Sequence, residues 1–216
     1  MSLPASIEIA ARLTLLVAGL LLPGSTLLRA LRLPWSLAAA FTTSAVVLYA
    51  IVLVFAWTGA VISLTTLAAA LTLFSLGLRL VPTRGPTAEI SSSFAGFWRL
   101  GGWTPLYVLF WLVVAWRLGT QPLSGPDTTF RWSWLAEQMV ALGTLDFYPP
   151  RSADDFLHYF WAESIPPEVA TLHAWVYACG GSRHALWTTP VVGLQLLSLH
   201  EIVWRLGNRW GGEAVA

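Results

Sequence analysis

Residues 33–78 contain no Asp, Glu, Lys or Arg. A helix needs about 20 apolar residues to cross a bilayer, because each residue adds about 1.5 Å to its length. This charge-free run is therefore long enough for two crossings, and Thr58-Gly59 is suited to the turn between them. The run predicts spanning helices at 36–57 and 60–80, joined by a hairpin too short to expose a soluble segment.

The composition of the whole chain agrees with a membrane protein. Hydrophobic residues make up 56% of the chain and charged residues 11%, whereas soluble domains carry about 25% charged residues. Three further spans are expected at 9–31, 102–118 and 185–204. We predict an all-α multispan membrane protein with about five transmembrane helices and an ordered helical outer loop. Its parts would be a membrane region with four spans (1–118), an outer amphipathic loop (119–184), and a last span with a cytoplasmic tail (185–216).

The placement of arginine predicts the orientation. Basic side chains gather after the first span, in the linker between the third and fourth spans, and after the last span: Arg29, Arg32, Arg79, Arg84, Arg99, Arg205 and Arg209. Five spans put these regions on one side, which the positive-inside rule makes cytoplasmic. We therefore expect a bacterial inner-membrane protein whose 118–184 loop faces outward. The net charge of +1 argues against a nucleic-acid partner.

The predicted outer loop holds most of the acidic residues. Seven of the eleven acids fall between 118 and 184: Asp127, Glu137, Asp146, Asp154, Asp155, Glu163 and Glu168. Two Ser-x-x-Asp sequences, starting at Ser124 and Ser152, are typical of helix starts. With glycines and Pro166-Pro167 as breaks, they predict helices at about 127–142, 153–163 and 168–179. Aromatic residues on one side of the first helix favour a position flat in the membrane interface.

The residue order in this loop resembles a known enzyme family. The pattern comprises Asp127, Arg131-Trp132, Ala136-Glu137-Gln138-Met139, Gly143, Tyr148-Pro149-Pro150, Tyr159, Pro166-Pro167, Trp175, Tyr177 and Gly180. It is similar to the first outer loop of C-type glycosyltransferases, which include protein O-mannosyltransferases and lipid A aminoarabinose transferases. The likeness covers about 115–200. It implies sugar transfer from a polyprenyl phosphate, by the N-terminal part of such an enzyme, by a degenerate member, or by a subunit completed by another chain.

Asp127 holds the position of the family's catalytic acid. The resemblance implies a general base that accepts the proton of the acceptor as the sugar carbon is attacked. The residues alone favour a structural role, because an acid in a first helical turn stabilises the helix dipole by about 0.3–1 kcal/mol. Arg131, four residues later, can pair with it.

Two further groups of loop residues suit a phosphate-bearing substrate. Arg131, Arg151 and Arg183 can hold a lipid phosphate by bidentate hydrogen bonds, although arginine is also common among lipid headgroups. Asp154, Asp155 and His158 can supply two carboxylates and an imidazole to Mg²⁺ or Mn²⁺ near a phosphate leaving group. Helix capping and solvation explain the same three residues.

The leading hypothesis is a membrane glycosyltransferase-like protein acting on a polyprenyl-phosphate sugar and a lipid, glycan or protein acceptor. The alternative is a non-catalytic membrane subunit that packs against other subunits in a larger complex. The sequence contains no G-x-x-x-x-G-K-[ST], H-E-x-x-H or G-x-S-x-G motif, which disfavours a P-loop ATPase, that type of zinc protease and an α/β-hydrolase.

Overall fold

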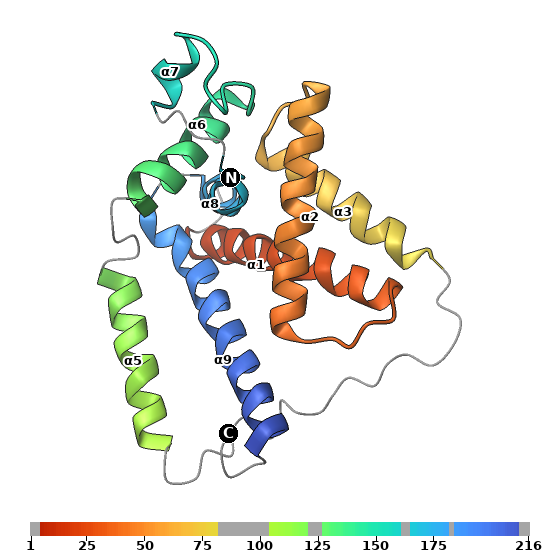
Figure 1. Ribbon diagram of the computed structural model, residues 1–216, viewed down its shortest axis with the longest axis vertical. Helices are drawn as coiled ribbons and strands as arrows, with labels where there is room; N and C mark the ends of the chain where they lie inside the picture. The colour runs from red at the N-terminus through yellow and green to blue at the C-terminus, as the bar shows by residue number, and fades with distance from the viewer. Residues whose placement is uncertain (1–4, 82–103, 121–126, 161–164, 182–183, 212–216) are drawn as a thin grey trace.

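The computed structural model describes residues 5–81, 104–120, 127–160, 165–181 and 184–211. Every regular element within these ranges is helical, so the predicted all-α class is confirmed (Figure 1). The elements are α1 (Ala5–Ala30), α2 (Leu37–Thr58), α3 (Leu64–Arg79), α5 (Thr104–Thr120), η2 (Asp127–Ser133), α6 (Trp134–Leu142), α7 (Asp155–His158), α8 (Glu168–Gly180), η3 (Ala185–Thr188) and α9 (Thr189–Gly211). Here η2 is a π-helix and η3 a 3₁₀-helix.

The α2–α3 hairpin forms where the charge-free run predicts it. Ser36 caps α2, with its hydroxyl accepting a hydrogen bond from the Ala39 backbone N–H. Gly59 ends the helix at φ +71°, a left-handed conformation that glycine adopts without steric cost. Ser63 and Thr66 then form a reciprocal capping box at the start of α3. Local capping chemistry therefore fixes both sides of this turn.

Helix α1 runs across α2 in Figure 1 instead of lying parallel to it. The two helices touch at Gly24, where an added Cβ would lie 2.0 Å from the Ala40 carbonyl oxygen. The Gly24 backbone N–H donates to the Ser44 hydroxyl at 2.8 Å, and Pro23 precedes it inside the helix. Small residues let helix backbones approach closely. Gly24 is therefore a point of close approach between these helices, and α1 continues through Pro23 without a break.

Helix α8 forms the centre of the core. Its residues from Ala170 to Cys179 are all buried, and it contacts α1, α2, α3, α6 and η2. The Trp175 ring lies against Gly19, and its indole N–H donates to the Leu16 carbonyl at 3.1 Å. The third predicted loop helix therefore forms at its expected position and is enclosed by its neighbours.

A hydrogen bond between distant parts of the chain lies at each end of the molecule. In Figure 1 the α2–α3 turn lies at the same end as α6 and α7, and the Ile62 N–H donates to the Gly143 carbonyl there. The C-terminal part of α9 lies at the other end, where the Glu201 carboxylate accepts from the Ala38 N–H at the start of α2. Glu201, only 4% exposed, also binds Arg205 through two hydrogen bonds. This buried carboxylate therefore joins α9 to α2.

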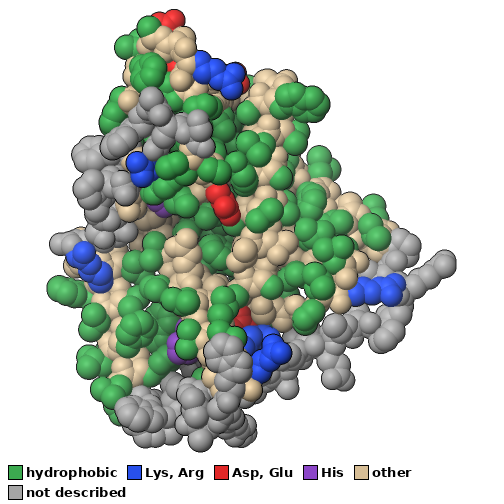
Figure 2. Space-filling view, in the orientation of Figure 1, with side chains coloured by type: hydrophobic (Ala, Val, Ile, Leu, Met, Phe, Trp, Pro, Cys, Tyr) green, Lys and Arg blue, Asp and Glu red, His purple; other side chains and the backbone are tan. Residues whose placement is uncertain are grey.

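Two helices, α1 and α2, are long and apolar enough to cross a membrane. Helices α3 and α5 are shorter apolar helices. Hydrophobic side chains cover much of the face in Figure 2, while charged side chains are sparse on it. None of the described side chains of α5 is buried, and α5 touches the remainder mainly through α9.

The other predicted loop helices differ in detail from expectation. The 127–142 helix forms as η2 followed by α6, and Gly143 ends it at φ +68°. The predicted 153–163 helix forms only as α7, because Tyr159 is extended and fully buried, with its ring 5.3 Å from that of Tyr148. The last three residues of the predicted range lie outside the described residues. Three predicted segments lie outside the described residues: 82–103, which holds the linker, 121–126, which holds Ser124, and 161–164.

Candidate functional site

A polar cluster lies where η2, α6 and α8 meet. We define it by Ser133, Glu137, His173 and Tyr177. Ser133 and Tyr177 are joined by a short hydrogen bond between their hydroxyls, both buried in the core. Ser133 is the last residue of the π-helix η2, and π-helical turns are rare and occur frequently at functional sites.

His173 is the most unusual member of the cluster. It is 6% exposed, and its Nδ1 is buried without a hydrogen-bond partner among the described residues. Burial lowers its pKa from 6.5 to about 4, because a charged imidazolium loses its hydration there. The ring centroid lies 6.3 Å from that of Tyr177. At neutral pH the cluster therefore contains a neutral imidazole.

Tyr177 is held in its protonated form. Burial raises the pKa of its phenol, and the nearby negative charge of Glu137 raises it further. The hydrogen bond with Ser133 acts in the opposite direction but does not reverse the shift. The hydroxyl is thus available as a neutral hydrogen-bonding group at physiological pH.

The structure places two predicted site residues in the element above this cluster. Asp127 is the first residue of η2, and Arg131 is half-buried within it. The Arg131 guanidinium lies 5.8 Å from the centroid of the Trp132 ring, within the range of a cation–π interaction. Helix η2 packs on both α6 and α8, so the backbone at Asp127 belongs to the same part of the fold as the cluster.

The remaining described candidates lie around α7. Arg151 and Asp154 are exposed, and His158 is half-buried with its ring 6.0 Å from that of Phe147. The Trp134 indole donates to the His158 carbonyl, which fastens α7 to α6. Arg183 lies outside the described residues. The candidates therefore form two groups, one at η2 and one at α7.

Asp155 has a clear structural role. Its carboxylate accepts hydrogen bonds from the backbone N–H groups of Arg151 and Ser152, and the Ser152 hydroxyl accepts from the Asp155 N–H. The hydrogen bond from the Arg151 backbone is the main reason that the pKa of Asp155 is lowered. This is the capping arrangement that the Ser-x-x-Asp sequence predicts.

The hydrogen bonds of Asp155 also bear on the predicted metal site at Asp154, Asp155 and His158. In the part of the chain that the structure describes, no three His, Cys, Asp or Glu side chains converge on a point suited to a metal ion. One oxygen of Asp155 is already committed to two backbone donors. The Mg²⁺ or Mn²⁺ site stays a prediction, and we derive no chemical step through a metal.

Sequence reasoning missed the role of Arg12. Its guanidinium binds the Glu8 carboxylate and also donates to the Cys179 carbonyl at 2.9 Å, near the end of α8. The last carbonyls of a helix lack partners within the helix, and a cation there interacts well with its dipole. Arg12 therefore completes the C-terminal end of α8. The sequence signal was an isolated basic residue inside an apolar segment, which is consistent with snorkelling as well as with pairing.

Comparison with known proteins adds no relative. No protein-family model, no curated protein and no solved structure matches this chain.

Proposed function

We propose that this chain is an integral membrane protein in which α1, α2, α3, α5 and α9 are the five spans. The exposed apolar surface of α5 supports this proposal. Leu106, Leu112 and Trp116 are 58–69% exposed, and water would penalise such a surface by about 25 cal/mol per Å². Lipid removes that penalty. Helices α3 and α5, with 16 and 17 residues, span about 24–26 Å, so the bilayer must thin slightly around them.

The proposed orientation puts α6 and α7 outside and the end of α9 in the cytoplasm. It is tested by labelling single introduced cysteines with a membrane-impermeant maleimide. The native Cys179 should react little with the maleimide, because it is fully buried and burial raises its pKa to about 12. Ser152→Cys should react in intact cells, and Arg209→Cys only after permeabilisation. The reverse pattern would contradict the orientation.

Within that topology we propose the activity of a C-type glycosyltransferase-like protein. It would move a sugar from a polyprenyl phosphate to a lipid, glycan or protein acceptor at the outer surface. The supporting observation is the start of a helical segment at Asp127, soon after the apolar α5, with that segment packed on the buried α8. Asp127 would accept the acceptor's proton as the new glycosidic bond forms. Arg131 and Arg151 would bind the phosphate of the donor.

The test of this activity is transfer by purified protein in liposomes. The donors are radiolabelled polyprenyl-phosphate mannose and polyprenyl-phosphate aminoarabinose, with membrane lipids and peptides as acceptors. Asp127→Asn should lower the rate about 10²–10⁴-fold, because it removes the base while asparagine still supports a helix start. The matched control is Asp146→Asn, an exposed acid of the same region, which should keep the parent rate. Parent activity in Asp127→Asn would refute the catalytic role.

The second candidate is a non-catalytic subunit of a larger membrane complex. The specific observation in its favour is again α5, since a helix exposed along its length can face a partner subunit as well as lipid. Size-exclusion chromatography distinguishes the two candidate functions. A complex subunit should elute with other chains from native membranes extracted in mild detergent, and Leu112→Trp on α5 should release it. An isolated enzyme should elute as this chain alone and be unaffected by that change.

A further inference from the structure

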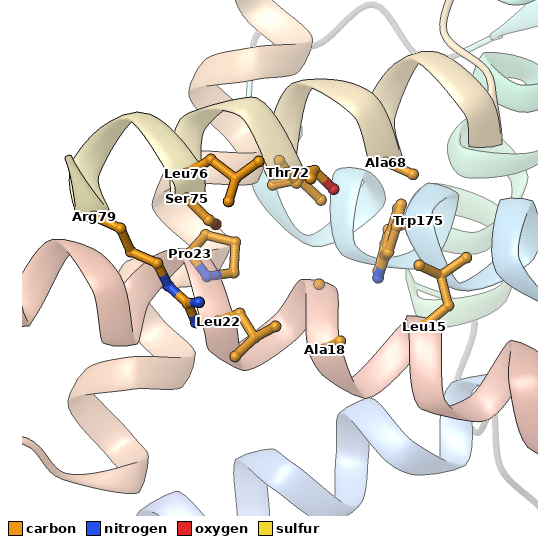
Figure 3. A pocket seen from close by; sticks show the side chains of 12 residues that line it. Leu15, Ala18, Leu22, Pro23, Ala68, Thr72, Ser75, Leu76, Arg79 and Trp175 are labelled. Carbon is orange, nitrogen blue, oxygen red and sulfur yellow. The ribbon is translucent and has the colours of Figure 1, made fainter.

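A groove of about 180 Å³ lies between α1 and α3, away from the polar cluster. Figure 3 shows its two walls and its two ends. Trp175 of α8 lies at one end, and Arg79, in the last turn of α3, lies at the other. Apolar side chains such as Leu15, Leu22 and Leu76 line its length. The groove is therefore an apolar channel with a single cation at one end.

The cation is available to a ligand. Arg79 is exposed, and the structure gives it no ion pair or hydrogen bond within the described residues. Its side chain reaches from α3 toward Leu22 and Pro23 of α1 in Figure 3, across the end of the groove. Along α3, eleven residues separate Ala68 from Arg79, which corresponds to about 16 Å. This length suits a single acyl chain.

We propose that this groove binds one acyl chain of an anionic phospholipid, with the lipid phosphate on Arg79. The chemistry of the two ends identifies the ligand: a guanidinium binds phosphate bidentately, and an apolar channel takes a hydrocarbon chain. In the proposed topology Arg79 lies on the cytoplasmic side, where anionic lipids attract basic residues. The proposal rests on the membrane insertion proposed above and is independent of sugar transfer.

The headgroup contact is tested by native mass spectrometry of the full chain in detergent. The probes are dioleoyl phosphatidylglycerol and dioleoyl phosphatidylcholine, added separately at equal concentration. The parent should retain phosphatidylglycerol preferentially, and Arg79→Gln should lower that retention about fivefold. Arg117→Gln is the matched control, since Arg117 is also an exposed arginine in the last turn of an apolar helix. Equal loss in both variants, or equal retention of the two lipids by the parent, would overturn the headgroup contact.

The acyl-chain contact is tested by filling the groove. Thr72 lines it and is exposed, so Thr72→Trp should occupy the channel and abolish retention of both lipids. Leu73 is exposed on the same helix outside the lining, and Leu73→Trp should retain lipid as the parent does. Elution volume and helical circular dichroism verify that both variants fold. Unchanged retention in folded Thr72→Trp would refute the groove as the site. If the parent protein binds neither lipid but the introduced cysteines still label as predicted above, the groove proposal fails and the topology proposal stands.

Discussion

Helices α5 and α8 are both apolar, yet they have opposite surroundings. In α8 every residue from Ala170 to Cys179 is buried against other helices. In α5 no described side chain is buried, and Trp116 is 69% exposed. Hydrophobicity alone does not distinguish their surroundings. It describes transfer out of water, and both a protein interior and a lipid bilayer exclude water.

What separates the two helices is polar chemistry. Helix α8 carries His173, Trp175 and Tyr177, and its Trp and Tyr side chains hydrogen-bond to other elements. A buried polar group without a partner is costly, so these side chains favour contact with protein. In α5 the Thr120 hydroxyl bonds to its own helix, and the Tyr107 ring contacts Trp111 of the same helix and His200 of α9. The exposed apolar side chains of α5 can therefore face lipid without loss of a polar contact.

The largest expected effect contrasts one tryptophan from each helix. Trp175→Ala should lower the free energy of unfolding by about 3–5 kcal/mol, because it empties a fully buried site and removes a hydrogen bond to Leu16. Trp116→Ala should change it by about 0.5 kcal/mol or less. Denaturant unfolding in detergent micelles, followed by circular dichroism, measures both. Similar losses in the two variants would break the comparison, and would place α5 in a packed environment.

The sequence predicts where the helices lie along the chain better than it predicts which helices pack against one another. Helices form near the five ranges predicted as spans and near two of the three predicted loop helices, because charge-free runs, capping serines and glycine stops act locally. The crossing of α1 over α2 depends on the fit between Gly24 and Ala40, which are close only in the folded chain. The burial of α8 likewise depends on Gly19 receiving the Trp175 ring. Such pairings leave no local pattern.

The candidate site was predictable to a similar degree. The capping role of Asp155 follows from Ser152 three residues before it, and it is confirmed by the hydrogen bonds. The cluster of Ser133 with Tyr177 joins residues 44 positions apart, so no spacing rule could reveal it. His173 lies in an apolar helix, and its sequence neighbours do not mark it as a site residue. Only the fold shows that its Nδ1 lacks a partner in the described residues.

The next effect concerns the pH dependence of α8. The unfolded chain protonates His173 near pH 6.5, while the folded chain resists protonation until about pH 4. The unfolded state therefore binds more protons in this window, so stability is complete above pH 6.5 and falls as the pH drops toward 4. The loss attributable to His173 is about 3 kcal/mol, from a shift of about 2.5 pH units.

His173→Gln isolates that contribution. The drop in unfolding free energy between pH 7 and pH 4 should be smaller in this variant than in the parent. His184→Gln, a substitution of an exposed histidine, should keep the parental drop. If His173→Gln and the parent lose the same stability over this range, α8 is more hydrated than the structure indicates. That result would weaken the contrast with α5.

The smallest effect compares a glycine of α1 that packs against α8 with a glycine of α5. At Gly19 an added Cβ would lie 2.3 Å from the Trp175 ring, whereas at Gly119 of α5 no heavy atom of the described structure lies within 4 Å. The Trp175 ring is fully buried and cannot move aside freely. Gly19→Ala should therefore cost about 1–3 kcal/mol of unfolding free energy. Gly119→Ala should be neutral or stabilise by up to about 0.5–1 kcal/mol, because alanine is the better helix former. Opposite signs in the same unfolding assay would support a packed α8 contact and an open α5. A cost at Gly119 as large as at Gly19 would instead mean that another protein chain closely covers α5, and the comparison would then favour the subunit over the isolated enzyme.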